Sequence, residues 1–275
     1  MKKICNKAVP RVMSIAGSDS GGGAGIQADL KTCSALGVYA TTVITALTAQ
    51  NTVAVKGIFA VDPSFVTAQI DAIMEDIGTD SAKTGMLDRK EIIQAVAEAV
   101  KRWKIEKFIV DPVMVAKSGD LLLKPDAVEA LIKELFPLSY AITPNAPEAQ
   151  AILSGMVIKS LSDMKDAAEQ LHRLGPGYVV LKGGHVESEK VVDVLYDGKN
   201  FKIFEADRIP SRNTHGTGCT FSAALAAFLA KGEEIEDAVA KAKRYVTDAI
   251  KAGLPIGSGH GPLNHFYNCR TGEVY

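Results

Sequence analysis

Residues 12–30 read VMSIAGSDSGGGAGIQADL, and this stretch decides the expected fold. The apolar run Val12–Ala16 predicts a buried strand, and a helix is expected over Ala24–Leu36. The glycines between them let the backbone approach a ligand closely and leave the first N–H groups of the helix facing it. The loop is neither a Walker A motif nor a dinucleotide-binding G-x-G-x-x-G fingerprint. We therefore expect a ligand-binding turn, with a purely structural turn as the alternative interpretation.

The same alternation of short β-rich runs and helix-length segments continues along the chain. It is typical of a parallel sheet with helices on both faces, so the expected fold class is α/β. Further strands are expected over Val38–Leu47, Lys107–Asp111, Tyr140–Thr143 and Tyr178–Lys182, and further helices over Ser64–Ile77, Lys90–Trp103, Pro125–Leu135, Ser162–Leu174, Gly218–Ala230 and Glu234–Gly253. Thr52–Val61 and Val191–Ala206 alternate like antiparallel or edge strands, the first as a small β flap. No linker or repeat divides residues 1–275, which predicts one domain.

The composition excludes several classes of protein. The 275 residues include 31 Lys and Arg against 32 Asp and Glu, a net charge of −1, with 47% hydrophobic residues, so disorder and nucleic-acid binding through a basic face are not expected. No apolar run approaches the ~18 residues of a membrane span, and the start MKKICNKAVPRV lacks the apolar core of a signal peptide. The four cysteines show no zinc-ligand spacing. Free thiols and a cytoplasmic location are expected, with no membrane partner.

A second glycine motif, NTHGTGCT at residues 213–220, also leads directly into a predicted helix. Backbone N–H groups and the positive end of a helix dipole suit the charge that develops in phosphoryl transfer, so 216–219 is a candidate anion hole. Cys219 lies in the first turn, where the pKa of a thiol tends to fall. Alternatively, Cys219 is a small packing residue and Thr220 is a helix cap. For His215, a hydrogen-bonded scaffold role is favoured over that of a base.

Polar residues follow three of the predicted strands. The stretch TPNAPE at residues 143–148 spaces Asn145 and Glu148 so that they can share an Mg²⁺ site. The alternative is a helix N-cap Asn with Glu at the third helical position. Asp111 and Lys182 end two other strands, and α/β sheets bind ligands at the carboxyl ends of their strands. Together with the anion hole, these residues indicate nucleotide-phosphate chemistry.

Seven motifs in chain order carry a resemblance to a known family: AGSDSGGGAGIQADLK, TALTAQNT, KTGML, VDPVM, TPNxxE, KGGH and NTHGTGCTxSAA. With them, the chain resembles the hydroxymethylpyrimidine/phosphomethylpyrimidine kinases of thiamin biosynthesis, within the ribokinase-like superfamily, from about Met13 to His265. The resemblance implies a three-layer α/β/α sandwich around a mostly parallel sheet of about eight strands. It also implies ATP, Mg²⁺ and a homodimer to which the β flap contributes.

The resemblance also implies roles for individual residues. For the pyrimidine they are Gln50 and the backbone around Gly17 and Ala24, with Asp29, Met86 and Val113 lining the pocket. The residues implied for nucleotide binding are Lys182, Thr217, Asn145 and Glu148. Those implied for Mg²⁺ and its waters are Asp111, Asn145 and Glu148. Those implied for catalysis are Lys182 and the anion hole of Gly216, Thr217, Gly218 and Cys219. Cys219 stands where sugar kinases of the superfamily carry an aspartate base, which leaves the identity of the base open.

The implied reaction is ATP-dependent phosphorylation of 4-amino-5-hydroxymethyl-2-methylpyrimidine and then of its monophosphate at the same site. The side-chain amide of Gln50 favours an aminopyrimidine, because it can pair with the amino group and a ring nitrogen together. A pyridoxine or pyridoxal kinase is the main alternative, and a catalytically silent pyrimidine-binding protein is another. Lys117, shortly after Asp111, is a candidate for screening the phosphate of the second acceptor.

Overall fold

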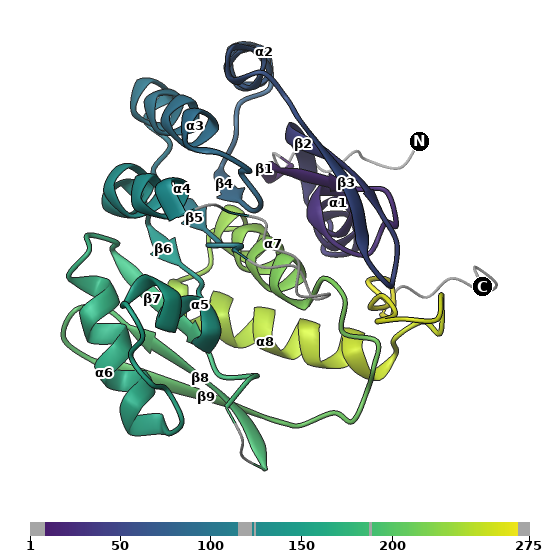
Figure 1. Ribbon diagram of the computed structural model, residues 1–275, viewed down its shortest axis with the longest axis vertical. Helices are drawn as coiled ribbons and strands as arrows, with labels where there is room; N and C mark the ends of the chain where they lie inside the picture. The colour runs from purple at the N-terminus through teal and green to yellow at the C-terminus, as the bar shows by residue number, and fades with distance from the viewer. Residues whose placement is uncertain (1–8, 115–122, 124, 187–188, 269–275) are drawn as a thin grey trace, which may run out of the picture.

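The computed structural model describes residues 9–114, 123, 125–186 and 189–268, and its strands form one nine-stranded sheet in the order β3-β2-β1-β4-β5-β6-β7-β8-β9 (Figure 1). The strands are β1 (Arg11–Asp19), β2 (Tyr39–Gln50), β3 (Val55–Ala60), β4 (Ser81–Thr84), β5 (Phe108–Val110), β6 (Ala141–Ile142), β7 (Tyr178–Lys182), β8 (Lys190–Tyr196) and β9 (Phe201–Asp207). In this spatial order, the neighbouring strands β2, β1, β4, β5, β6 and β7 pair in parallel. Strand β3 at one end of the sheet, and β8 and β9 at the other, pair antiparallel. The predicted α/β class with a mostly parallel sheet is confirmed.

Helices cover both faces of this sheet, which gives the three layers seen in Figure 1. They are α1 (Gly25–Ala35), α2 (Pro63–Asp76), α3 (Lys90–Trp103), α4 (Pro125–Ala130), α5 (Ala146–Ile152), α6 (Leu161–His172), α7 (Thr217–Ala230) and α8 (Ile235–Lys251). In one core, helices α1, α7 and α8 pack against Val12, Ile109 and Val180 of the sheet. In the other, the helices from α2 through α6 pack against Met13 and Leu181. Val12 and Met13 enter different cores because successive strand residues point to opposite faces.

Helix α7 positions the functional edge of the sheet. Its sequence TGCTFSAALAAFLA buries nine residues, most of them small. Small side chains on several sides of the helix let it pack against β4, β1, α1 and α8 at once. The helix is therefore held firmly with its N-terminus at the carboxyl ends of the central strands.

The two segments predicted to interrupt the βα rhythm form the antiparallel ends of the sheet. Strand β3 pairs with the second half of β2, with Leu47 opposite Phe59, and β8 and β9 form a hairpin beyond β7. Both predictions are confirmed. Strand β2 runs past its predicted end at Leu47 as far as Gln50, so it delivers Gln50 to the carboxyl edge.

Two elements differ from the sequence prediction. The helix expected over Pro125–Leu135 is α-helical only to Ala130 and continues as a π-helical segment (Leu131–Leu135) and a 3-10 turn (Phe136–Leu138). Pro137 lacks the N–H that an α-helix running through it would need. The bounds of the four-residue strand β4 were not predicted, because its sequence SAKT holds a charged residue and no large apolar one. None of the helices in the described part of the chain is long and apolar enough to cross a membrane.

Candidate active site

A cavity of about 410 Å³ lies at the carboxyl ends of the central strands. Every predicted site residue except Asp29 lines it: Gly17, Ala24, Gln50, Met86, Asp111, Val113, Asn145, Glu148, Lys182, Gly216, Thr217, Gly218 and Cys219. These residues come from segments spread over most of the chain, and the parallel strands bring them to one edge. The structure therefore gathers the predicted residues into one site.

The glycine loop after β1 is organised by a side chain for which the sequence suggested no role. The carboxylate of Asp19 accepts hydrogen bonds from the backbone N–H groups of Gly21, Gly23 and Ala24 at 2.8, 3.1 and 2.8 Å. Burial opposes the charge on Asp19, but the hydrogen bond from His215 and these amides hold its pKa below the ordinary value. The ionised carboxylate thus fixes the loop. An Asp immediately before a glycine run is the signal that could have revealed this role, because Asp side chains often bond nearby backbone N–H groups.

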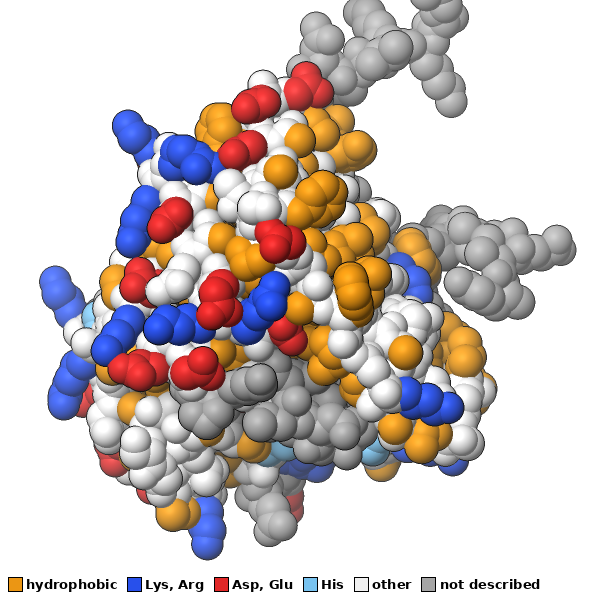
Figure 2. Space-filling view, turned by 45° about the horizontal axis from the view of Figure 1, so that its top comes forward, with side chains coloured by type: hydrophobic (Ala, Val, Ile, Leu, Met, Phe, Trp, Pro, Cys, Tyr) orange, Lys and Arg blue, Asp and Glu red, His pale blue; other side chains and the backbone are white. Residues whose placement is uncertain are grey.

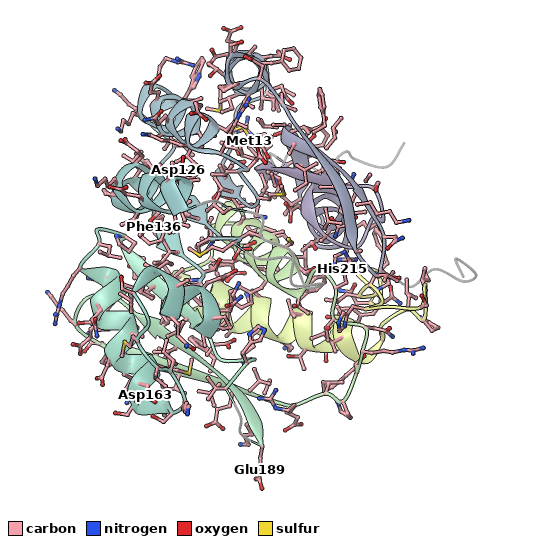
Figure 3. The ribbon with its side chains drawn as sticks, viewed as in Figure 1. Met13, Asp126, Phe136, Asp163, Glu189 and His215 are labelled. Atoms are coloured by element: carbon pink, nitrogen blue, oxygen red, sulfur yellow. The ribbon has the colours of Figure 1, made fainter. Side chains whose placement is uncertain are left out.

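His215 joins the glycine loop to the anion loop (Figure 3). Its Nε2 lies 2.8 Å from Oδ2 of Asp19 and 3.4 Å from the amide nitrogen of Gln50. A Cβ added at Gly23 would lie 2.4 Å from the ring, so the imidazole fills the space that this glycine leaves. The backbone N–H of His215 donates to the carbonyl of Gly261 at 3.1 Å. The ring is held by hydrogen bonds, in the scaffold arrangement favoured for it from the sequence.

The anion loop leads into the first turn of α7. Gly216 is the N-cap residue, with a φ of 85°, and a Cβ there would lie 1.9 Å from the carbonyl oxygen of Gly23. Only glycine lets the two loops approach this closely. Gly218 and Cys219 follow in the first turn and line the cavity. N–H groups of a first helical turn have no partner within the helix and, with the helix dipole, favour a bound anion.

Lys182 and Asp111 form an ion pair beside this turn. Lys182 Nζ lies 3.0 Å from Oδ1 of Asp111, which also accepts a hydrogen bond from Thr143 at 2.9 Å, while Ser222 donates to Oδ2 at 3.2 Å. Burial opposes the charge on Asp111, but Lys182 lowers its pKa below the ordinary value. Burial likewise disfavours the ammonium of Lys182, yet Asp111 and Glu148 raise its pKa. Lys182 is consequently a permanent cation at the base of the cavity.

Asn145 and Glu148 begin α5 with the arrangement that the sequence offers as the alternative to a metal site. Glu148 N–H donates to Oδ1 of Asn145 at 2.9 Å, and Asn145 N–H donates to Oε2 of Glu148 at 2.8 Å, which is a capping box. Burial, opposed by Lys182 and reinforced by Asp111, raises the pKa of Glu148 to about 8. Its carboxylate therefore lacks sufficient compensating positive charge in the protein alone.

The donor set of this edge fits Mg²⁺ held together with a phosphate ligand. Within the described ranges no group of three or more His, Cys, Asp or Glu side chains could hold a metal ion by itself. Mg²⁺ usually takes one or two carboxylates and completes its shell with water and substrate phosphates. Asp111 and Glu148 line the same cavity, and Oε1 of Glu148 takes no part in the capping box. A divalent cation at this place would stabilise the ionised carboxylate of Glu148, whose pKa burial raises.

A second cavity, of about 250 Å³, adjoins the first and was not anticipated from the sequence. Lys182, Thr217 and Gly218 line both cavities. The rest of its wall combines apolar side chains of β8, α7 and α8 with charged ones: Val191, Phe221, Val246 and Ile250 together with Asp193, Asp207, Arg208 and Lys243. These residues belong to ordinary helix and strand patterns, so no local motif distinguishes them. The anion loop thus lies between two different cavities.

Two expectations about site residues are wrong. Asp29 does not line the pocket, because its carboxylate is fully buried and pairs with Lys83 at 3.0 Å. The pKa of Cys219 does not fall: burial raises it to about 11, although the charge of Lys83 opposes this. Lys117, the candidate for screening the second acceptor, lies outside the described residues.

Comparisons with known proteins point to one family. A sequence profile of the family described as phosphomethylpyrimidine kinase matches residues 19–264. The thiamine biosynthesis bifunctional protein of Geobacter sulfurreducens is 53% identical over 254 residues, 92% of this chain and 52% of that protein, so this chain spans about half its length. The hydroxymethylpyrimidine/phosphomethylpyrimidine kinase of Rhizobium meliloti is 50% identical over 93% of this chain and 96% of that protein. Among solved structures, the ADP complex of Bacillus subtilis pyridoxal kinase has a TM-score of 0.88 at 42% identity, covering 94% of this chain and 98% of that one.

Proposed function

This chain belongs to the phosphomethylpyrimidine kinase family, and we propose that it transfers the γ-phosphoryl group of ATP to 4-amino-5-hydroxymethyl-2-methylpyrimidine and then to the monophosphate. It is a kinase with a ribokinase-like fold. The observation that carries the proposal is the meeting of two cavities at Gly218 and Lys182. A nucleotide in the smaller cavity and an acceptor in the larger would meet at this point. Such positioning supplies most of what phosphoryl transfer requires.

The larger cavity suits the pyrimidine. Gln50 presents a side-chain amide that can pair with an amino group and a ring nitrogen, and the backbone around Gly17 and Ala24 can approach the ring closely. Met86 and Val113 supply apolar contact to the ring faces. The substrate would thus be oriented by polar groups and held by apolar contacts to its ring, as in most small-molecule sites.

In this proposal, the anion loop stabilises the negative charge of the phosphoryl group during transfer. Thr217 and Gly218 of the first turn and the ammonium of Lys182 line both cavities, and Cys219 follows in the larger one. Preorganised donors of this kind stabilise charge as it develops, without reorganisation during the reaction. Asp111 holds the ammonium of Lys182 in place before substrates arrive, and Thr143 holds the carboxylate of Asp111.

Cys219 is not suited to be the general base at neutral pH. Its thiol, with a pKa raised to about 11, is almost entirely protonated at pH 7. A loose transition state needs little deprotonation of the acceptor before transfer. The backbone of residue 219, rather than its sulfur, therefore carries its contribution to the reaction in this proposal.

Mg²⁺ is part of the proposal as a partner of the nucleotide. Asn145, Glu148 and Asp111 would hold it, partly through water, and it would neutralise charge on the phosphate oxygens. A single site would perform both phosphorylations, because the larger cavity combines this carboxylate set with the glycine loop and the smaller cavity does not. Lys117 remains a proposed aid to the second step through screening of the acceptor phosphate.

We further propose a homodimer that uses the flap of β2 and β3, and a cytoplasmic location. Figure 2 shows a broad band of hydrophobic side chains on one face of the molecule. On the flap, Leu47, Ile58 and Phe59 are exposed, Phe59 by 71%. An exposed apolar sheet edge of this kind is usually covered by a partner. Light scattering of wild type and Phe59→Asp tests the dimer, which the substitution should dissociate.

Pyridoxal kinase is the second candidate, because the solved Bacillus subtilis structure that covers 94% of this chain carries that activity in its name. Both acceptors are six-membered heteroaromatic rings with a hydroxymethyl arm. The deciding experiment is a coupled assay of ADP release with ATP, Mg²⁺ and each vitamin in turn. A kcat/KM higher for the pyrimidine, with diphosphate as final product, supports the main proposal. A higher value for pyridoxal supports the second candidate, and no ADP release with either indicates a silent binding protein.

A further inference from the structure

A buried ion pair has no part in the roles proposed above. Lys83 on β4 and Asp29 on α1 are both 0% exposed, and Lys83 Nζ lies 3.0 Å from Oδ2 of Asp29. The hydroxyl of Ser14 donates to the same oxygen at 2.6 Å. Burial disfavours the ammonium, but the adjacent carboxylate raises the pKa of Lys83 above its ordinary value. Lys83 therefore stays charged inside the protein.

This pair is poorly satisfied for a buried pair. The second carboxylate oxygen of Asp29, Oδ1, has no hydrogen-bond partner in the described structure. Asp29 is also the only hydrogen-bond acceptor of the three Lys83 N–H groups among the described residues. Two charges taken out of water with so few partners contribute little to stability, and an apolar pair of similar volume would often serve the fold as well. The arrangement points to an electrostatic role.

The pair lies beneath the first turn of α7. Ser81 Oγ donates to the carbonyl of Ala226 at 2.8 Å, so this face of β4 is turned toward α7. Lys83 stands two residues further along the same face, about 7 Å nearer the carboxyl edge. Helix α7 starts at that edge, so an equal distance along it leads from Ala226 back to about Ser222. The extended lysine side chain can then reach toward the turn that contains Cys219.

Helix α1 brings Asp29 to the same place. Gly25 and Asp29 are four residues apart on α1 and share a face of that helix. Helix α1 packs against α7, and a Cβ at Gly216 would lie 3.2 Å from Ala24, so the start of α1 lies against the anion loop. Burial has the largest effect on the pKa of Cys219, and among the neighbouring charges Lys83 has the strongest, lowering it more than Asp29 raises it. Lys83 belongs to the face of β4 that is turned toward α7, so the positive end of the pair lies on the side of the loop.

We propose that Lys83, held by Asp29, is a positioning residue of the anion loop: its buried ammonium adds positive potential to the first turn of α7 and favours negative charge there during transfer. This inference rests on the proposed kinase function. It adds a second cation to the site. Lys182 lines both cavities, whereas Lys83 is buried and touches no substrate. Charge supplied from behind the loop needs no desolvation when substrates bind, which makes it effective in a low-dielectric setting.

The test is Lys83→Met, which keeps an unbranched side chain one atom shorter than lysine and removes its charge. Asp29 can then take up a proton, because burial already raises its pKa. The matched control is Ser14→Ala, which removes a hydrogen bond to the same carboxylate oxygen without changing the charge. Two quantities are measured: kcat with the preferred vitamin, and the alkylation rate of Cys219 by iodoacetamide at pH 9, followed by mass spectrometry of its peptide. Cys219 serves as a local probe of potential, since only its thiolate reacts.

We expect Lys83→Met to lower kcat by about tenfold with both KM values within about twofold, and to slow alkylation of Cys219 by about tenfold, because a nearby charge shifts a pKa by one unit or more. Ser14→Ala should change neither by more than about twofold. An unchanged alkylation rate in Lys83→Met, or equal losses in both variants, overturns the inference. If Lys83→Met lacks a cooperative melting transition, Lys83→Met with Asp29→Asn replaces it, and the same two measurements decide in the same way. Failure of the wild type to release ADP would instead overturn the proposed function, while the alkylation rates still judge Lys83.

Discussion

The two cavities share six lining residues but are otherwise walled in different ways; the six are Asn145, Lys182, His185, Thr214, Thr217 and Gly218. The larger is bounded by backbone from two glycine loops and by polar strand ends, whereas the smaller is bounded by apolar and charged side chains of β8, β9, α7 and α8. The residues that carry out the reaction are therefore common to both cavities, whereas the residues that select each ligand differ between them. Changes at the edge should harm the reaction with any substrates, and changes in one wall should harm only the ligand of that cavity.

Gly218→Asp should have the largest effect, because it alters the edge that both cavities share. A carboxylate at this site would lie close to Lys182 and oppose the anion that the loop stabilises, and loss of such stabilisation costs on the order of 10²- to 10³-fold in kcat. Gly218→Ala is the matched control. A Cβ there would lie 3.5 Å from Lys182 Nζ and 3.8 Å from Asp111, which are ordinary contacts, so kcat should fall far less. Steady-state ADP release measures both, and equal losses would show that bulk rather than charge is decisive.

Gln50→Ala should affect the larger cavity alone. Removing the amide loses one or two hydrogen bonds to the ring, about 1 to 2 kcal/mol, so the KM for the pyrimidine should rise about tenfold while the KM for ATP stays within about twofold. Gln69→Ala is the control, because this glutamine bonds the backbone of Ile44 on the same strand and lies outside both cavities. A rise in the KM for ATP in Gln50→Ala would contradict the separation of the walls.

Ile250→Ala should have the converse and smaller effect. It removes part of the apolar wall of the smaller cavity, about 1 kcal/mol, so the KM for ATP should rise about fivefold with the KM for the pyrimidine unchanged. Ile256→Ala is the control, since Ile256 is more than half exposed and lines neither cavity. If the pyrimidine KM rose instead, the assignment of the two ligands to the two cavities would be reversed.

The same contrast explains how far the sequence could predict the molecule. The larger cavity is built from short local motifs at strand ends, and parallel pairing brings such ends together without further information. The motifs that contain Asn145 and Lys182 therefore suffice to predict that both residues lie at one edge, as the structure confirms. The smaller cavity depends on which faces of α7 and α8 meet β8. Residues such as Phe221 and Val246 follow ordinary core patterns, and only the packed fold shows that they border a space.

The errors in the sequence prediction share a physical origin. The bounds of strand β4 were not predicted, because Lys83 is a charged residue in a strand whose four residues are all buried. The family resemblance implies a pocket position for Asp29, although Asp29 pairs with that lysine inside the protein. The pKa of Cys219 was expected to fall at a helix N-terminus, but burial has the larger effect. Each case depends on burial and on a partner distant in sequence, and local pattern carries neither.

Cys219→Ser should have the smallest effect, because it changes a side chain of the anion loop while keeping the backbone N–H groups that carry the charge. We expect kcat to fall by less than about threefold. The thiol itself should titrate late: its pKa of about 11 lies above the ordinary value, so it is neutral at pH 7 and the thiolate fraction rises about tenfold with each pH unit until the pKa is approached. Alkylation of the Cys219 peptide by iodoacetamide should follow that rise from pH 7 to pH 10, without a plateau. The opposite result would be a plateau below pH 8 together with near-complete loss of kcat in a Cys219→Ser variant that keeps its fold by circular dichroism. The thiolate would then be the base, and the side chain of residue 219 rather than its backbone would be decisive.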